Sequence, residues 1–390
     1  MSVLKTILDR KNLSFCIFFI IFSFIATIFS ELFLGGLSTS FIKILGKTLM
    51  LCLAAIALDL VWGYCGILSL GHFAFFAIGG YIIGMWLMYE RTKEIIIQAS
   101  LEQIIPPTSE ELKEAIGSQI FGVVGGSEIP FLWVFADYLW VHLFFIVLIP
   151  GLIALVFGWL AFRSRVTGVY LSILTQAMTL ALSLYLFQND SGLRGNNGLS
   201  GLQNIPGLSE VDQSIISILF LWASTVALIL GFIIATSVAR SKLGNLMLGI
   251  RDDENRIRFL GYDVEAYKLF VFIISAVMAS IAGALYYPQA GIVNPTELAP
   301  IASIYLAVWV SIGGRGKLIG AVLGAAFVSL VSSFFTSGKI PNLDLGFFVV
   351  SWVDWWLVIL GLSFVAVTLF APGGLLGVLW FLVRKGMRNG

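Results

Sequence analysis

Long apolar runs alternate with short polar stretches along the whole chain. About ten runs are apolar enough to be membrane segments, and they cover roughly residues 13–29, 45–62, 72–88, 137–162, 166–187, 215–235, 268–287, 299–312, 318–335 and 353–370. An upright helix needs ~20 residues to cross a bilayer, so the eighth run, of about 14 residues, predicts a short or broken helix. The pattern predicts one all-α polytopic membrane domain over residues 1–390.

The composition supports this interpretation. Hydrophobic residues make up 59% of the chain and charged residues 12%, whereas a soluble domain has roughly 25% charged residues. The net charge of +1 gives no field that would attract nucleic acid. The three cysteines lie in apolar runs, and no P-loop, H-E-x-x-H, G-x-S-x-G or C-x-x-C motif occurs. We therefore expect a membrane protein surrounded by lipid, with no enzymatic activity, metal or cofactor of its own.

The basic residues predict the orientation. If the N-terminus is cytoplasmic and ten segments cross in turn, most of the 23 Lys and Arg residues, including Arg384, Lys385 and Arg388, are cytoplasmic. Cytoplasmic loops carry such an excess, so we expect both termini inside. The acidic stretch of residues 89–135 is then an outer insert. With a turn at Pro106–Pro107, we expect it to form short interfacial pieces.

Glycine interrupts the apolar stretch of residues 63–81. This stretch contains five glycines together with Ser69 and His72. Irregular backbone at membrane depth persists only where protein or a watery cavity satisfies it, as in the broken helices of transporters. Asp59, one turn earlier, is either an acceptor on a solute path, a charge that ties broken helices together, or a cap for the break. His72 either caps the next helix or bonds a freed carbonyl, or else it contacts solute or relays protons. Residues 311–320 form a second glycine-broken point.

The fifth segment has a polar face. Its members are Ser172, Thr175, Gln176, Thr179 and Ser183, which occur at helical spacing. In lipid such a stripe must face protein or water. Interhelical hydrogen bonding and a lining for a small neutral solute are equally good interpretations.

Residues 241–268 combine an apolar helical face with a charged end. Asp252 and Arg256, like Glu254 and Arg258, stand four residues apart and predict ion pairs on a helix. The stretch is either a docking element for a cytoplasmic partner or a solvated loop.

Several motifs resemble one known family. WGYCGILSLGHFAFFAIGGYIIGM at residues 62–85 resembles the signature of the permeases of branched-chain amino acid ABC importers, and GIRDDENRIRFLGYDVEAYKLFVF at 249–272 resembles their cytoplasmic loop. GGRGKLIGAVLGAAF at 313–327 and APGGLLGVL at 371–379 also fit. Residues 157–202, with Asp59, are similar to the urea-transporter branch of this family.

The resemblance implies a set of partners. We expect a permease subunit of a urea ABC importer in a bacterial inner membrane, paired with a second, related permease. Two cytoplasmic ATPase subunits would use ATP, and an extracytoplasmic binding protein would deliver the solute. Residues 244–260 would form the coupling helix. The coupling region would include Gly244, Ile250, Arg251, Asp252, Asp253, Glu254, Arg258 and Gly261.

The sequence is compatible with more than one class of substrate. The residues expected along the solute path are Asp59, Ser69, His72, Ser172, Thr175, Gln176 and Thr179. Branched-chain or other amino acids and amides are the alternative substrates, and a stand-alone channel or secondary carrier is a further alternative. We take Asp59 as the only fixed charge in the spans, which disfavours a zwitterionic solute.

Overall fold

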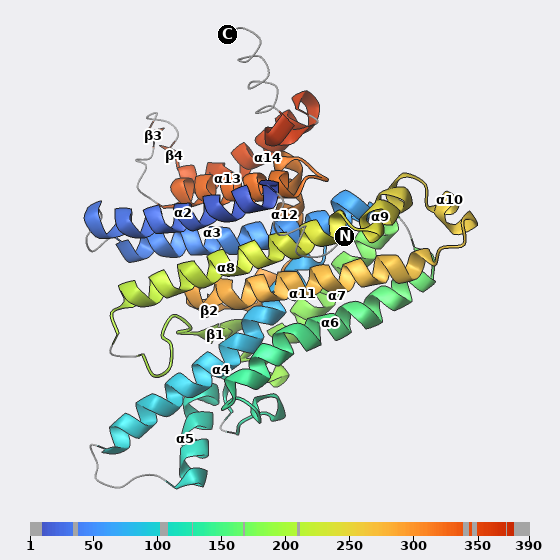
Figure 1. Ribbon diagram of the computed structural model, residues 1–390. Coiled ribbons are helices and arrows are strands. Elements are labelled where there is room, and N and C mark those ends of the chain that lie inside the picture. Colours follow the sequence, from blue (N-terminus) through green and yellow to red (C-terminus); the bar gives the residue numbers. More distant parts are fainter. Residues whose placement is uncertain are drawn as a thin grey trace.

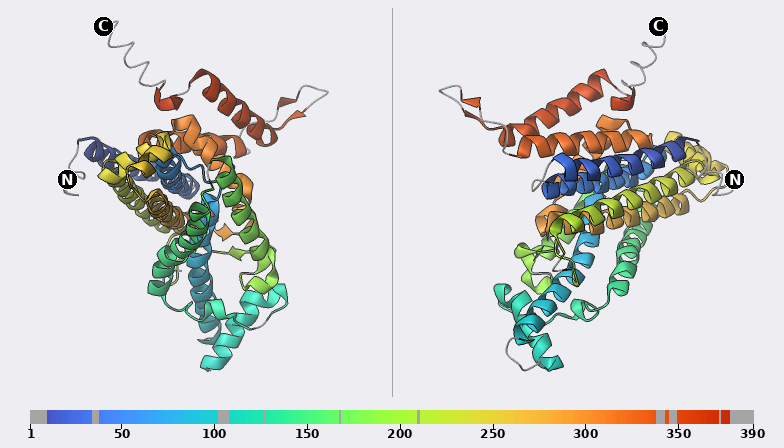
Figure 2. Two further views of the ribbon diagram at one scale, coloured as in Figure 1. Left: turned by 90° about the vertical axis from the view of Figure 1, so that its right-hand side faces the viewer. Right: turned by 60° about the vertical axis from the view of Figure 1, so that its left-hand side comes forward.

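The computed structural model shows long helices stacked side by side, joined by short connections (Figures 1 and 2). It describes residues 10–33, 38–101, 108–126, 128–166, 168–208, 211–337, 343–344, 349–371 and 373–377. The predicted turn at Pro106–Pro107 and the basic residues Arg384, Lys385 and Arg388 lie outside these ranges.

In chain order the elements are α2 (Arg10–Phe33), α3 (Ser38–Asp59), η2 (Leu60–Tyr64), α4 (His72–Leu101), α5 (Ser109–Phe121), η3 (Gly122–Val124), η4 (Phe131–Trp133), α6 (Leu139–Arg163), α7 (Val169–Phe187), η5 (Asn189–Ser191), η6 (Gly195–Asn197), β1 (Leu199–Ser200), α8 (Gln213–Ala239), α9 (Lys242–Asp252), α10 (Glu254–Phe259), α11 (Val264–Ala290), β2 (Ile292–Val293), η7 (Pro295–Leu298), α12 (Pro300–Gly313), α13 (Leu318–Thr336), β3 (Leu343–Asp344), β4 (Val349–Val350) and α14 (Trp352–Phe370).

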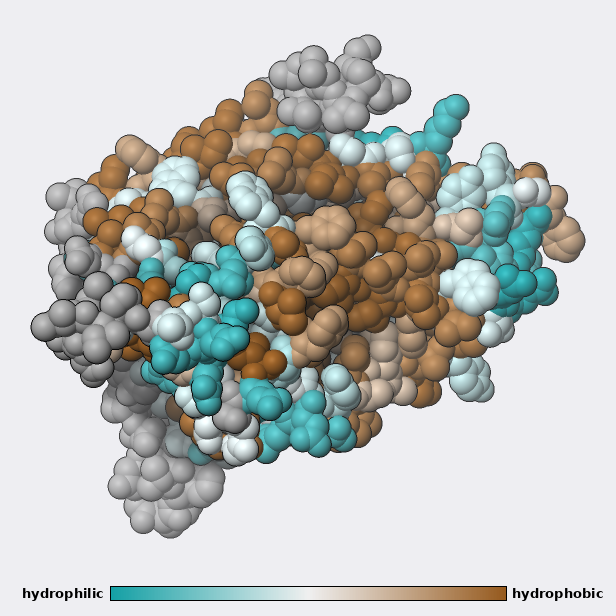
Figure 3. Space-filling view, turned by 90° about the horizontal axis from the view of Figure 1, so that it is seen from below, coloured by the Kyte–Doolittle hydropathy of each residue, from teal (hydrophilic) through white to brown (hydrophobic). Residues whose placement is uncertain are grey.

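The all-α polytopic prediction is confirmed. Within the described residues, eight helices are long and apolar enough to cross a membrane, and two shorter apolar helices, α12 and α14, complete the ten predicted segments. Seen from below, a broad hydrophobic surface is bordered by hydrophilic surface where α9 and α10 lie (Figure 3). This pattern is the one that a lipid belt requires. We call the two ends of the molecule the α9 end and the α5 end.

The centre of the bundle is formed by α3 and α4, most of whose residues are buried. α4 packs against α11 at small residues. A Cβ atom on Gly283 would overlap the carbonyl oxygen of Phe76, and one on Gly79 would overlap that of Ser280. The two backbones can approach this closely only because glycine stands at both positions.

The outer insert differs from the expectation of short interfacial pieces. α4 continues without a break to Leu101, and a second helix, α5, follows. Thr108 caps α5 by accepting a hydrogen bond from the Glu111 N–H, and Glu111 bonds back to the Thr108 N–H. This capping box stabilises the start of a helix that has few apolar residues to bury. The end of α4, from residue 89 to residue 101, and α5 therefore form a helical arm that projects from the bundle (Figure 1).

Two distant loops meet on the α5 side of the bundle. β1 pairs with β2 in antiparallel register, Leu199 opposite Val293. This short pairing joins the glycine-rich loop after α7 to the segment that links α11 to η7. It holds η7 beside α4 and α7.

Candidate functional site

The predicted helix break lies at the end of α3. The α-helix stops at Asp59, one π-helical turn follows as η2, and α4 starts only at His72. Gly66 has φ +79°, a conformation that strains any residue with a Cβ atom. Residues 60–71 therefore form a specific interruption of the α-helical structure between the central helices α3 and α4. We call this segment the break.

Asp59 ties the break to the second glycine-broken point. Its side chain is fully buried, and its Oδ1 accepts a hydrogen bond of 2.7 Å from the Gly316 N–H in the α12–α13 connection. It makes no side-chain cap to η2, so the capping interpretation is wrong. A Cβ atom on Gly63 would overlap both this carboxylate and the Gly316 backbone. Among the interpretations left open, the contact corresponds to a charge that holds broken segments together.

Two arginines bind the same backbone. Arg251 of α9 donates a hydrogen bond of 2.7 Å to the Gly63 carbonyl, and Arg315 donates one of 3.3 Å to the Trp62 carbonyl. The Arg315 guanidinium also lies 4.9 Å from the centroid of the Trp62 ring. The Gly63 carbonyl is thus bonded by a charged donor, and the Trp62 carbonyl, which also accepts from the Gly66 N–H at 3.2 Å, gains a second donor. The sequence reasoning missed Arg315, although its glycine-rich neighbourhood marked the position.

The polar face of α7 supports the other half of the break. Ser172 donates a hydrogen bond of 2.7 Å to the Leu68 carbonyl, and Thr175 accepts one of 3.0 Å from the Leu70 N–H. Thr179 bonds within its own helix, to the Thr175 carbonyl. The hydroxyls of Ser172 and Thr175 therefore bond α7 to the non-helical part of the break. Gln176 belongs to the same face but lies half-buried, away from these contacts.

Ser69 and His72 are both fully buried. The Ser69 hydroxyl accepts a weak hydrogen bond of 3.4 Å from the Gly71 N–H, inside the break itself. His72 Nε2 lies 2.5 Å from the Ser275 hydroxyl of α11, between the rings of Phe75 and Phe272. The ring thus links α4 to α11 at the first residue of α4.

The coupling region forms two short helices rather than one. Asp253 stands between α9 and α10 and caps α10 by accepting a hydrogen bond of 3.2 Å from the Arg256 N–H. In place of the predicted pair between Asp252 and Arg256, Asp252 contacts Arg251 and Asp253 lies 3.9 Å from Arg256. Extended backbone at Asp253 breaks the four-residue spacing on which that prediction relied. Residues 244–260 are therefore not a single helix.

The remaining coupling residues lie on both sides of this bend. Gly244 packs so closely on the Ala239 carbonyl that a Cβ atom there would overlap it. Ile250 is buried, and Gly261 has φ +87° after the end of α10. Ile250 thus fastens α9 to the bundle, while Gly261 allows the turn toward α11.

A second set of ion pairs joins α10 to α11. The predicted pair is present, with Arg258 2.7 Å from Glu254, and Lys268 lies 2.5 Å from the same carboxylate. Arg258 also contacts Glu265 at 2.6 Å. Burial opposes ionisation of Glu254, but the hydrogen bonds from Lys268 and Arg258 outweigh it and hold the pKa of Glu254 below its ordinary value. A pocket of about 220 Å³ separates this cluster from the break, and Cys65 and Arg251 are in its wall.

Charges in the membrane segments are more numerous than the sequence reasoning allowed. Lys43 and Lys47 lie in the same span as Asp59. Lys47 falls inside the apolar run of residues 45–62, so this signal was present and overlooked. Glu297 of η7 lies close enough to Lys47 for the two charges to interact. The prediction of Asp59 as the only fixed charge in the spans is wrong.

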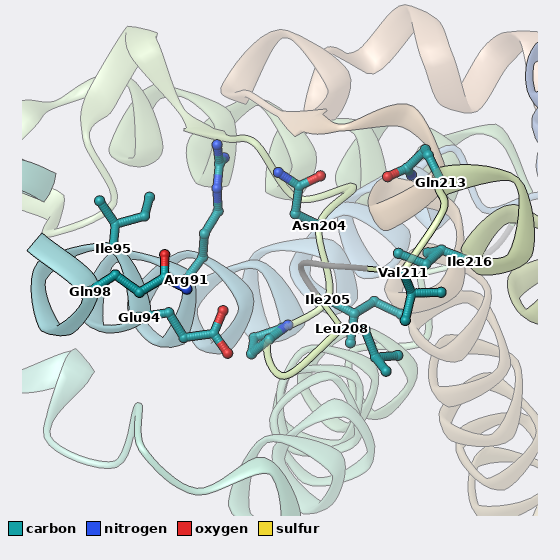
Figure 4. A pocket seen from close by; sticks show the side chains of 11 residues that line it. Arg91, Glu94, Ile95, Gln98, Asn204, Ile205, Leu208, Val211, Gln213 and Ile216 are labelled. Carbon is teal, nitrogen blue, oxygen red and sulfur yellow. The ribbon is translucent and has the colours of Figure 1, made fainter.

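The α5 end carries a polar pocket of about 260 Å³ between the arm and residues 201–208 and 211–213 (Figure 4). Arg91 donates a hydrogen bond of 3.1 Å to the Gly201 carbonyl, and Glu94 accepts one from the Gly207 N–H. These two bonds fasten the loop to the arm.

Comparison with known proteins identifies one family. The family model described as branched-chain amino acid transport system / permease component matches residues 40–368. The branched-chain amino acid permease LivM of Escherichia coli K12 is 27% identical over 41% of this chain and 43% of its own length. The autoinducer 2 import permease LsrC of Shigella flexneri is 33% identical over 29% of this chain and 35% of its own length. The chain thus aligns with less than half of these curated relatives. No solved structure matches it.

Proposed function

Since the chain belongs to the family of permease components of branched-chain amino acid transport systems, we propose that it forms part of the membrane pathway of an ATP-driven urea importer. It is a multi-pass protein of the bacterial inner membrane, and we propose that it acts as a permease rather than as an enzyme. The proposed partners are a second, related permease, two cytoplasmic ATPase subunits and an extracytoplasmic binding protein. ATP would be used by the ATPase subunits.

One observation carries the coupling part of this proposal. Arg251 of α9 holds the Gly63 carbonyl, while Asp59, on the other side of the same turn, holds Gly316. A displacement of α9 by an ATPase subunit would therefore be transmitted directly to the break and to the α12–α13 connection. Under this proposal the α9 end is cytoplasmic and the α5 end faces the binding protein.

A second substrate class, the amino acids, gains support from a specific observation. A zwitterion needs partners of both signs, and Lys47 and Glu297 supply them within the bundle. Two of the hydroxyls assigned to urea, those of Ser172 and Thr175, are already bonded to the break. The proposal of urea as the substrate rests on the resemblance of residues 157–202 to the urea-transporter branch and on the neutral side chain of Gln176.

The test is uptake by the reconstituted complex. The chain is co-expressed with its paralogous permease, ATPase subunits and binding protein, and placed in proteoliposomes with labelled urea. We expect ATP-dependent uptake that unlabelled urea and short amides reduce. Competition by leucine but not by urea would replace urea with an amino acid as substrate. Uptake without ATP, or failure to co-purify with ATPase subunits, would contradict the importer and favour a channel or carrier.

A further inference from the structure

A second polar cluster lies inside the bundle, away from the break. It forms where η7 meets α4 and where α3 contacts α11 and α12. Its members are Lys47 of α3, Tyr81 of α4, Tyr287 of α11 and Glu297 of η7. They come from four elements that are far apart in the sequence, and none of them was among the expected pathway residues.

Both tyrosine hydroxyls are buried without a partner. Tyr81 is 3% exposed and Tyr287 is 0% exposed, and neither hydroxyl has a hydrogen-bond partner among the described residues. Buried polar groups are nearly always satisfied, so such a group indicates a site where water or a ligand binds. Two such groups beside one another strengthen the indication.

The two rings are held in place by their surroundings. The Tyr287 ring packs where a Cβ atom of Gly80 would be, and it lies 5.5 Å from the ring of Phe76. Tyr81 follows Gly80 directly on α4. Packing therefore fixes the rings, and neither hydroxyl is free to turn toward bulk water.

Opposite charges border these hydroxyls. The Glu297 carboxylate lies close enough to Lys47, Tyr81 and Tyr287 for its charge to act on each of them. No ion pair joins Lys47 to Glu297 in the part of the chain that the structure describes, so each retains capacity for a ligand atom. The region where α3, α4, α11 and η7 meet thus offers two buried, unpartnered hydroxyls together with an ammonium and a carboxylate.

We propose that Lys47, Tyr81, Tyr287 and Glu297 form a binding site for the transported solute. The Lys47 ammonium and the tyrosine hydroxyls would donate to an oxygen acceptor of the solute, and Glu297 would accept from its N–H groups. Urea presents a carbonyl and N–H groups, and an α-amino acid presents a carboxylate and an ammonium. The shared chemistry is a small molecule with an oxygen acceptor at one side and N–H donors at the other. This inference rests on the proposed function.

The decisive variant is Tyr81→Phe, which removes one oxygen atom and keeps the ring. Glu297→Gln and Lys47→Met remove the charges. Matched controls are Tyr138→Phe and Lys113→Met, at exposed positions remote from the cluster. Each complex is purified, checked for co-purification and basal ATPase activity, and assayed for uptake of labelled urea and labelled leucine. The affinity of the detergent-purified complex for each solute is measured without binding protein.

We expect Tyr81→Phe to weaken solute binding by about tenfold, the loss expected for one buried hydrogen bond. The controls Tyr138→Phe and Lys113→Met should keep the solute affinity and the basal ATPase activity of the unaltered complex. If the complex binds leucine, Glu297→Gln should weaken that binding strongly, because the leucine ammonium is cationic; if it binds urea, the loss should be smaller, because Gln still accepts from an N–H group. Unchanged binding and uptake in both Tyr81→Phe and Glu297→Gln would overturn the site while leaving the importer intact. Absence of binding of either solute to the unaltered complex would also overturn it. Absence of ATP-dependent uptake would refute the importer separately.

Discussion

At the scale of single residues, the fully buried Asp59 holds two broken segments together through one oxygen atom. The Gly316 N–H would be left unpaired without it, and an unpaired buried donor costs about 1–3 kcal/mol. We expect Asp59→Leu to lower uptake at least tenfold without loss of assembly. Asp59→Asn should retain most of the uptake, because the Asn side-chain oxygen supplies the same acceptor. Uptake and co-purification are measured together. Equal loss in both variants would show that the negative charge itself is required, as expected of a solute contact.

Gln176 and Thr175 are neighbours on α7 with different surroundings. Thr175 bonds the break, whereas Gln176 is half-buried and apart from it. We expect Gln176→Leu to lower urea uptake and leave the melting temperature of the complex unchanged. Thr175→Val should instead lower the melting temperature, since it leaves the Leu70 N–H unpaired. Normal urea uptake by Gln176→Leu would remove this residue from the pathway.

At the scale of elements, the bend between α9 and α10 determines which acidic residue can report on docking. Asp253 caps α10, so its replacement also weakens the helix. Asp252 is a cleaner probe, because its side chain is 71% exposed and contacts only the neighbouring Arg251 among the described ion pairs. We expect Asp252→Lys to keep ATPase activity but lower the solute transported per ATP. Asp263→Asn, which retains an acceptor at the cap of α11, is the control. Unchanged stoichiometry would argue against docking at α9.

The ion pairs of α10 predict a dependence on pH. The pKa of Glu254 is lower in the folded protein than in the unfolded chain. The ion pairs of Glu254 therefore contribute fully to the stability of the fold when the pH is above the pKa that Glu254 has in the unfolded chain. This stabilisation is lost as the pH falls through the pKa that Glu254 has in the folded protein. We expect amide exchange in α10 to accelerate over this acidic range, relative to exchange in α8, as measured by hydrogen exchange. Glu254→Gln should remove this pH dependence. If amide exchange in α10 of the variant depended on pH as it does in the unaltered chain, Glu254 would not be the titrating group.

At the scale of the whole molecule, the sequence predicted what depends on local pattern and missed what depends on distant neighbours. Ten apolar runs became helices because burial in lipid leaves the backbone no alternative. The break was visible because glycine marks it. The partner of Asp59, by contrast, is a backbone N–H 257 residues away, which no periodicity reveals. The proximity of Lys47 to Glu297 depends on how η7 is folded back, and the extension of α4 to Leu101 depends on packing against α5.

The orientation of the bundle follows from the same basic residues that lie around α9. Arg251, Arg256 and Arg258 cluster at one end, together with the first residues of α2, while α5 lies at the opposite side of the bundle (Figure 1). Positive residues favour the cytoplasmic side. We therefore expect a membrane-impermeant maleimide to label Lys113→Cys in intact spheroplasts and Asp252→Cys only after the membrane is opened. The unaltered chain is the control: Cys52 and Cys65 are buried, and it measures any labelling of the half-buried Cys16. Labelling of Asp252→Cys from outside would invert the topology and place the proposed docking surface on the wrong side of the membrane for an ATPase.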